Sequence, residues 1–473
     1  MVSSLLAPTS SAGLFSTQAA PSGSVAAVPP PPAVAAGLED PQAAQTSAIT
    51  MTALARIFRL TIAFITRETL QPVVTRYYVA GPHVTAANRY PSRGTCVTIP
   101  APVPASAKCR PDRPRGRLMY KSLRAQTLHY LARPHERIPQ APIDRPAAWR
   151  GEDLRQRSDW MITLSPTEIT EIQSAAQRAE ALCKPLTALG RNDLPLPTLS
   201  PRIAQWRDHI RHGRGFVLIR GLPVDTLSEA QIEIVYWGLG HHLGIPGAQN
   251  PQGDLLGHVR DQRSGDDVRY YRTNKALAPH CDAADVVGLL CLKKARSGGL
   301  SRIASSVAVF NELLRRRPEL VPRLFQPFWF DTKGDGGIPA FPIEPCRYAA
   351  GELRSFWLSD YFRSAQNMPH VPRLSPEERE LLDLYDTLAG DPAFYLDMDL
   401  EPGDLQLISN HTIVHARTGF EDWPEPEQRR HLLRLWITLP EAEAAKIRWL
   451  RGLSLARLTA TAARELVRTK LAR

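Results

Sequence analysis

The run His280-Cys281-Asp282 places an imidazole and a carboxylate two residues apart. In an extended segment, residues at i and i+2 point to the same face, so both side chains would converge on one point while Cys281 faces away. Two histidines and one carboxylate form a facial set of ligands whose open positions suit Fe(II) and oxygen chemistry. An isolated run of this kind is usually a surface pair, so the prediction depends on a third ligand elsewhere in the chain.

A second histidine-bearing stretch, NHTIVHAR, offers that ligand far away in the sequence. Its two histidines, His411 and His415, would share one face of a continuous strand. The asparagine at its start follows a Gly-Asp turn, which predicts a bend, whereas His415 lies mid-strand between apolar neighbours. His280, Asp282 and His415 are therefore the predicted metal ligands and the predicted catalytic centre.

An arginine-bearing stretch, RRHLLRLW, follows. A period of two places Arg430 and Arg434 on one face, and apolar residues on both faces predict a strand that is buried on both sides. A buried guanidinium needs an anionic partner, and its planar fork matches a carboxylate. The anion could belong to the protein or to a ligand, and two inward arginines on one strand favour a ligand for at least one of them.

Taken together, these features resemble the taurine and 2,4-dichlorophenoxyacetate dioxygenase family (TauD/TfdA-like) of Fe(II)/2-oxoglutarate-dependent oxygenases. The resemblance covers about residues 146–440 and rests on an ordered set of motifs: His280-x-Asp282, Ser297-Gly298-Gly299-Leu300-Ser301, His415-Ala416-Arg417 and the pair Arg430/Arg434. It implies a mainly β fold with flanking helices around a double-stranded β-helix, or jelly-roll, core. It also implies Fe(2+) as the metal and 2-oxoglutarate as the co-substrate.

The same resemblance implies roles for further residues. Arg430 would bind the far carboxylate of 2-oxoglutarate, and Ser301 stands where the family often places a threonine hydroxyl on that co-substrate. Arg434 matches an arginine that meets the anionic group of the substrate in the taurine enzyme, although pairing with a protein carboxylate is an equal alternative. Asn274 is a predicted substrate contact, and we expect residues 271–282 and 355–366 to line the substrate pocket.

The implied reaction is hydroxylation of a small organic substrate, which can be anionic, with release of succinate and CO2. Retention of Asp282 favours hydroxylation, because halogenases of this type give up the carboxylate to make room for halide. Cys281 and Ser301 stand where threonine is common, and neither change removes a metal ligand. Two alternatives stay open: a jelly-roll metal enzyme that does not use 2-oxoglutarate, and a catalytically silent binding protein of the same fold.

Helix and strand signals surround these motifs from about residue 147 onward. Three helices are predicted to begin with a capping box, in which a serine caps the helix and a Glu or Gln three residues later reaches back. These boxes are Ser165/Glu168, Ser228/Gln231 and Ser375/Glu378. Strand-like runs lie at 215–223, 286–295, 403–410, 412–417 and 431–439. Short strands at irregular spacing fit a jelly roll, whereas the lack of GxGxxG and GxxxxGK[ST] motifs argues against Rossmann and P-loop enzymes.

The chain of 473 residues has a net charge of +11, and its meaning depends on where the charge lies. Residues 1–145 carry 16 Lys and Arg against 6 Asp and Glu, which leaves 42 against 41 for residues 146–473. The main body is nearly neutral, so nucleic-acid binding has little electrostatic support. The predicted organisation is a disordered, basic, Pro/Ala-rich leader (1–145), a dioxygenase-like domain (146–445) and a C-terminal helix (446–473).

No stretch approaches the roughly 20 apolar residues of a transmembrane helix. Six scattered cysteines without a CxxC pair indicate free thiols in a reducing compartment. We therefore expect a cytoplasmic protein, or an organellar one if translation begins at Met51, where an acid-poor, arginine-bearing segment starts. The expected partners are a small-molecule substrate and O2, with no specific nucleic acid and no membrane, while homo-oligomer formation is left open.

Overall fold

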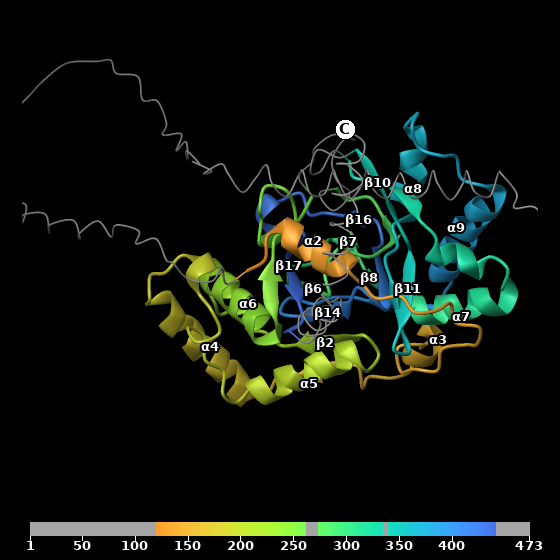
Figure 1. Cartoon of the computed structure of the whole chain (residues 1–473). Helices are drawn as coiled ribbons and strands as arrows, with labels where there is room; N and C mark the ends of the chain where they lie inside the picture. The colour runs from red at the N-terminus through yellow and green to blue at the C-terminus, as the bar shows by residue number, and fades with distance from the viewer. Residues whose placement is uncertain (1–119, 262–272, 334–338, 441–473) are drawn as a thin grey trace, which may run out of the picture. The chain divides into compact units, whose positions relative to one another are not determined.

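The computed structural model describes residues 120–261, 273–333 and 339–440, which are coloured in Figure 1. Most of the predicted leader, the predicted C-terminal helix and Tyr271 lie outside the described residues. The helices are α2 (Leu123–Leu131), α3 (Gly151–Leu154), α4 (Pro166–Glu180), α5 (Ser200–Arg211), α6 (Glu229–Leu243), α7 (Ser306–Arg316), α8 (Ser359–Ser364) and α9 (Pro376–Ala389). Short 3-10 turns lie at Leu186–Ala188, Val321–Phe325, Ala365–Asn367 and Pro426–Gln428.

The strands are short, as predicted. They are β1 (Met161–Thr163), β2 (Phe216–Arg220), β3 (Ile245–Gly247), β4 (Leu256–Val259), β5 (Leu277–His280), β6 (Val286–Lys293), β7 (Ser297–Gly298), β8 (Ser301–Ser305), β9 (Phe328–Asp331), β10 (Ala340–Ile343), β11 (Cys346–Ala349), β12 (Glu352–Ser355), β13 (Tyr395–Met398), β14 (Leu405–Ser409), β15 (Ile413–Arg417), β16 (Phe420–Glu421) and β17 (His431–Thr438). Each of the five predicted strand-like runs contains one of them: β2, β6, β14, β15 or β17.

Two β-sheets form the centre of the described chain. The larger sheet has the strand order β1-β2-β14-β6-β17-β3, with β4 also paired to β17, and the smaller sheet has the order β13-β8-β15-β5. From β13 onward the strands enter the two sheets in turn, with β13 and β15 in the smaller sheet and β14 and β17 in the larger. This alternation is the double-stranded β-helix of a jelly roll, so the predicted fold class is confirmed.

Apolar side chains form three layers around the sheets. Between the sheets, Phe216, Ile408 and Trp436 of the larger sheet pack in one cluster with Ile303 and Ile413 of the smaller. Behind the larger sheet lie α4, α5 and α6, and behind the smaller sheet lie α7 and α9, as Figure 1 shows. Strand β17 contributes to the layers on both of its sides, as its sequence predicted.

The three predicted capping boxes are present and begin α4, α6 and α9. In α4, for example, Ser165 Oγ accepts from the backbone N–H of Glu168, whose carboxylate accepts in return from the N–H of Ser165 at 2.7 Å. Proline occupies the first turn of α4 and of α9, where its missing N–H costs no hydrogen bond. The boundaries of these helices therefore follow from local sequence.

Residues 120–145 pack closely on the sheets. Lys121 pairs with β3 through two backbone hydrogen bonds, and Tyr130, in α2, is fully buried in the layer behind the smaller sheet. The predicted start of the folded domain, residue 146, thus lies inside the packed region rather than at its edge. The reason is that α2 buries polar residues, Gln126, His129 and Tyr130, which a search for apolar periodicity passes over.

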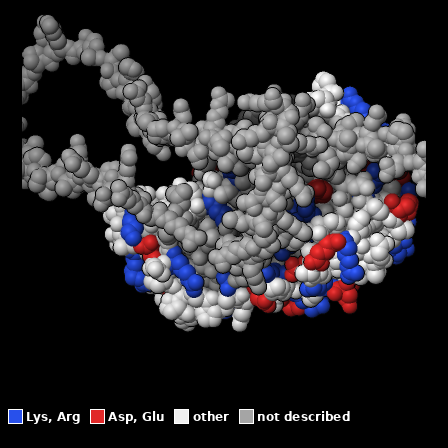
Figure 2. Space-filling model, in the orientation of Figure 1, with Lys and Arg blue, Asp and Glu red and all other residues white. Residues whose placement is uncertain are grey.

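The described surface agrees with the near-neutral composition of the main body. Figure 2 shows basic and acidic side chains interspersed on the described part of the visible face. Within the described residues, no helix has the length and apolar character needed to cross a membrane. The four described cysteines are free thiols, and burial raises the pKa of Cys281, Cys291 and Cys346 to about 12.

Candidate metal centre

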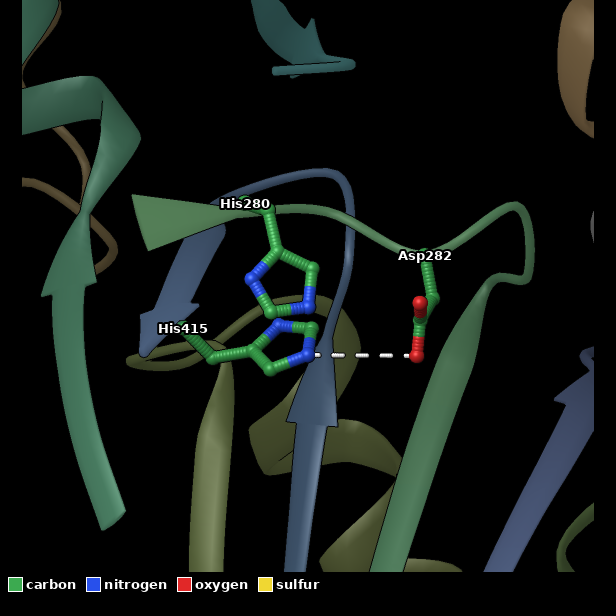
Figure 3. A group of neighbouring side chains, drawn as sticks. All are labelled: His280, Asp282 and His415. Atoms are coloured by element: carbon green, nitrogen blue, oxygen red, sulfur yellow. Dashed lines mark ion pairs between the residues drawn. The ribbon is translucent and has the colours of Figure 1, made fainter. Parts of the chain in front are cut away.

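The three predicted ligands meet at one end of the space between the sheets (Figure 3). His280 is the last residue of β5, and it lies directly opposite His415 in the antiparallel pairing of β5 with β15. The two ring centroids are 4.2 Å apart. Asp282 follows on the turn after β5, so the H-x-D spacing brings its carboxylate to the same point. One potential ligand atom of each residue lies within 4.8 Å of the others, and no second group of this kind occurs in the described residues.

Asp282 is held in place by the larger sheet. Its Oδ2 accepts a hydrogen bond from Trp436 Nε1 at 3.0 Å and lies 3.5 Å from Arg434 Nη1. Burial alone would raise the pKa of Asp282, but the positive charge of Arg434 and the nearby imidazoles outweigh it and lower the pKa. The carboxyl is therefore ionised at neutral pH, as a metal ligand must be.

The histidines are prepared for metal binding in two ways. Burial, and then the neighbouring His280, lower the pKa of His415 to about 3, so its ring is neutral and keeps a lone pair for a metal. Nδ1 of His280 lies 2.8 Å from the carbonyl oxygen of Ala278, to which it can donate, leaving Nε2 as the ligand atom. Two imidazoles and one carboxylate fit a divalent first-row metal with open coordination positions.

His411, the competing histidine of the same stretch, points to another partner. Its Nε2 lies 2.8 Å from Asp285 Oδ1, and its ring stacks on Tyr130 with centroids 4.7 Å apart. The bend predicted before β15 is present, because Asn410 and His411 form the turn between β14 and β15. The structure thus brings His415, and not His411, to His280 and Asp282.

Arg430 lies just before β17 and is buried. Its Nη2 donates to the carbonyl oxygen of Gly299 at 3.5 Å, its guanidinium lies 5.2 Å from the ring centroid of Phe420, and its Nη1 has no hydrogen-bond partner. Burial lowers the pKa of Arg430 to about 10, which leaves it charged at neutral pH. A buried guanidinium with an unsatisfied N–H and no ion pair among the described residues fits a carboxylate ligand.

Ser301 lies close by, at the start of β8. It is buried and sits opposite Arg417 in the pairing of β8 with β15. Its hydroxyl donates to Gln406 Oε1 at 2.9 Å. Rotation of the Gln406 amide would let the amide donate to Ser301 Oγ instead, which would free the hydroxyl hydrogen for a carboxylate.

Arg434 has partners in the protein. Its Nε donates to Gln249 Oε1 at 2.7 Å, and its Nη1 faces Asp282. Gln249 itself is held by the carbonyl oxygens of Leu255 and Arg434, to which its Nε2 donates. The alternative of a protein carboxylate partner for Arg434 is therefore realised in part, and the carboxylate is the predicted metal ligand.

The remaining predicted substrate contacts lie on two further segments. Asn274 is exposed, and its carbonyl oxygen accepts from the N–H of Phe420 at 3.1 Å. The segment 355–366 touches the centre through Leu358, which forms an isolated bridge with His280. Gln249 had no sequence signal, and Arg417 was named only as part of the motif His415-Ala416-Arg417, without a role of its own. Arg417 is buried beside Arg430 and donates to the carbonyl oxygens of Thr273 and Lys275.

Comparison with known proteins adds an independent observation. The family model described as "Taurine catabolism dioxygenase TauD, TfdA family" matches residues 183–436. FR-33289 synthase of Streptomyces rubellomurinus is 32% identical over 317 residues, which are 64% of this chain and 92% of that protein. The taurine hydroxylase-like protein SAT17 of Stachybotrys chartarum is 26% identical over 304 residues, 61% of this chain and 77% of that protein.

A solved structure shows the same fold. An asparagine oxygenase in complex with Fe(II), 2S,3S-3-hydroxyasparagine and succinate superposes with a TM-score of 0.50. It is 19% identical, and the match covers 59% of this chain and 93% of that one. At this identity the likeness concerns the fold alone.

Proposed function

The chain belongs to the taurine catabolism dioxygenase TauD, TfdA family and is an Fe(II)/2-oxoglutarate-dependent dioxygenase, and we propose that His280, Asp282 and His415 hold its iron. The observation that supports this assignment most is the convergence of the three ligand atoms within 4.8 Å. When bound, iron and 2-oxoglutarate supply an oxidative decarboxylation, which puts one oxygen atom of O2 into succinate and the other into a substrate C–H bond.

The protein residues around the iron position the reactants. Trp436 fixes the rotation of the Asp282 carboxylate, and Arg434 supplies positive charge that keeps this carboxylate ionised before the metal arrives. The low pKa of His415 keeps its ligand nitrogen free of a proton. The packed layer between the sheets excludes water from one side of the proposed iron site. Reactants bound there would be held by protein groups rather than by water.

We assign Arg430 and Ser301 to 2-oxoglutarate. The unsatisfied Nη1 of Arg430 would donate to the far carboxylate of the co-substrate, and the Ser301 hydroxyl would donate after rotation of the Gln406 amide. Arg417 adds a second buried positive charge beside them. A jelly-roll metal enzyme that does not use 2-oxoglutarate would have no need of two buried cations at this place.

The proposed substrate is a small molecule with an anionic group. Arg434 lies beside the proposed iron ligand Asp282, and iron would take over part of the charge that Asp282 now shares with Arg434. The guanidinium, which also donates to Gln249, would then direct more of its charge toward an anion of the substrate. We assign the contacts with the rest of that molecule to Asn274 and to the segment 355–366, which meets His280 through the bridge at Leu358.

The test is spectroscopic and needs no knowledge of the substrate. Anaerobic addition of Fe(II) and 2-oxoglutarate to the protein should produce the weak visible charge-transfer band of a chelated keto acid. His280→Ala and Asp282→Ala should abolish it, while Cys183→Ser, at an exposed thiol remote from the site, should leave it unchanged. A parent protein that binds iron without developing the band would contradict the use of 2-oxoglutarate.

Substrate class requires a second measurement. A screen for succinate release should compare sulfonates, phosphonates, amino acids and aryloxy acids with neutral analogues of the same size. We expect release above the uncoupled background with anionic compounds. Equal stimulation by their neutral analogues would remove the assignment of Arg434.

A further inference from the structure

A second cluster of ionisable side chains lies beside the metal centre and takes no part in ligand binding. It consists of His129, Asp285 and His411, and we call it the Asp285 cluster. Asp285 Oδ2 lies 2.9 Å from His129 Nε2, and Oδ1 lies 2.8 Å from His411 Nε2. The backbone N–H of Leu439 donates to Oδ2 at 2.9 Å as a third contact.

The Asp285 cluster joins three parts of the chain that are distant in sequence. His129 belongs to α2, Asp285 lies three residues after the proposed ligand Asp282, and His411 lies four residues before His415. Asp285 is 2% exposed, so its charge depends on these donors rather than on water. Burial alone would raise the pKa of Asp285, but the hydrogen bonds from His129 and His411 outweigh it and hold the pKa far below its usual range.

Asn410 connects the cluster to the metal loop, which is the turn 281–285. The side-chain Oδ1 of Asn410 accepts from the backbone N–H of Asp282 at 3.2 Å. The backbone N–H of Asn410 donates to the carbonyl oxygen of Asp285 at 3.1 Å. Asn410 is fully buried, so both contacts are shielded from water. The backbone of Asp282 is thus fixed by the residue that precedes His411.

Helix α2 holds Asn410 from the other side. The Tyr130 hydroxyl is shared between the carbonyl oxygens of Asn410 and Ser355, at 2.9 and 2.8 Å, and its ring stacks on His411. One turn of α2 therefore contacts the metal loop through His129 and Asp285, and the turn before β15 through Tyr130. The helix itself is anchored at its N-terminal side by Lys121 and Gln126, which pack on β3.

We propose that α2, which lies outside the stretch matched by the family model, is a positioning element for the iron ligands: His129 and Tyr130 fix the loop of Asp282 and the strand of His415 relative to each other. The inference rests on the proposed assignment of His280, Asp282 and His415 to iron. The physical basis of this inference is that the metal loop is not part of a helix or strand that would hold its shape. Asp285 and Asn410 connect the loop to α2. Residues that orient metal ligands affect metal affinity without touching the metal.

The experiment compares two buried histidines in the full chain. His129 and His242 are each 7% exposed and each bond through Nε2, His129 to Asp285 and His242 to the carbonyl oxygen of Leu194 at 2.8 Å. His242 lies in α6, behind the larger sheet, and serves as the matched control. The protein is titrated with Co(II) alone, at a temperature below the unfolding temperature of each variant. The visible d–d absorption of bound Co(II) measures the metal affinity.

His129→Leu should weaken Co(II) binding about tenfold or more, the usual effect of losing an outer partner of a ligand set. His129→Gln should recover part of the affinity because its amide can donate to Asp285. Tyr130→Phe, which keeps the ring and loses the hydroxyl, should weaken binding about fivefold. His242→Leu should lower the unfolding temperature and leave Co(II) affinity unchanged.

Two results would overturn the inference: Co(II) affinity in both His129→Leu and Tyr130→Phe equal to that of the parent, or an equal loss in His242→Leu. The Co(II) affinity of His280→Ala tests the assignment of the metal ligands separately. If His280→Ala binds Co(II) as tightly as the parent, the proposed iron site fails. If His280→Ala loses binding while the α2 variants keep it, the iron site stands and only the role of α2 fails.

Discussion

Arg430 carries a buried positive charge that has one unsatisfied N–H and no ion pair among the described residues. Such a group is costly in a folded protein unless a ligand completes it, because water cannot solvate it. Arg430 lies beside Ser301 and Arg417, so this part of the described site carries two buried positive charges that an anionic ligand would neutralise. At the scale of single residues, the co-substrate assignment is therefore the most sharply testable one.

Arg430→Gln should raise the dissociation constant of 2-oxoglutarate by about 30-fold or more, since a buried charged hydrogen bond contributes about 2 kcal/mol or more. Iron affinity should be unchanged because Arg430 has no contact with the three ligands. Anaerobic titration of the visible band with 2-oxoglutarate measures the first quantity, and titration with metal alone measures the second.

The adjacent Arg429 provides the control. Within the described residues, its guanidinium donates to the carbonyl oxygens of Trp423 and Pro424 in a surface loop. Arg429→Gln removes the same charge one residue away and should leave 2-oxoglutarate affinity within about twofold. Equal weakening in both variants would show that general charge, and not the buried site, attracts the co-substrate.

Residues of the site differ in how far they could be predicted. His280 and Asp282 follow from a spacing of two in an extended segment, and the structure places them on one point. Choosing His415 over His411 depended on apolar neighbours, and the partner that occupies His411, Asp285, lies in a different part of the chain. Gln249 had no signal, because a single glutamine acquires its role only when the fold brings it to Arg434.

Among the elements, those with locally encoded ends were the most predictable. Capping boxes fix the first turns of α4, α6 and α9 through contacts three residues apart. The burial of helix α2 shows the opposite case, because its buried face consists of Gln126, His129 and Tyr130, and their partners lie more than a hundred residues away. Burial of polar groups is stable only when distant partners are present, so sequence patterns cannot reveal it.

The contact between α3 and β13 gives a prediction at this scale. A Cβ added to Gly151, the first residue of α3, would overlap the backbone carbonyl oxygen of Tyr395. Because a backbone atom cannot move aside, Gly151→Ala should lower the free energy of unfolding by about 2 kcal/mol or more. Urea unfolding followed by circular dichroism measures the change.

Gly390, which ends α9, is the matched position for this substitution. A Cβ there would meet its nearest atom, Asp386 O, at 3.2 Å, and its backbone adopts an ordinary negative φ. Gly390→Ala should therefore change the free energy of unfolding by less than about 1 kcal/mol. A loss at Gly151 as small as the loss at Gly390 would show that α3 can move away from β13 without cost.

For the molecule as a whole, the two sheets and their helical layers bury several histidines in neutral form. Burial is the largest cause that lowers the pKa of His415 to about 3 and of His241, His411 and His431 to about 4. In the unfolded chain a histidine titrates near 6.5. Between about pH 6.5 and pH 4 the unfolded state therefore binds more protons than the folded state, and the stability must fall as the pH falls.

His241, which is remote from the metal centre, allows this linkage to be measured. Its Nε2 is buried without a hydrogen-bond partner. His241→Gln should reduce the loss of unfolding free energy between pH 6 and pH 4.5 by up to about 1 kcal/mol per pH unit, a value discounted for its partial exposure. Urea unfolding of the metal-free protein at several pH values checks this. If the pH dependence of the unfolding free energy is the same in the variant and the parent, His241 is protonated in the folded protein as readily as in the unfolded chain.

The position of α2 has a consequence for how this gene can be rearranged. The stretch that the family model matches begins at residue 183, whereas α2 and α4 both end before it. A recombination event at the start of that stretch would transfer His280, Asp282 and His415 intact but would leave behind the helix bonded to Asp285 and Asn410. On the proposed role of α2, the smallest segment that could be exchanged between relatives as a working unit begins no later than Lys121, where the chain first pairs with β3 among the described residues.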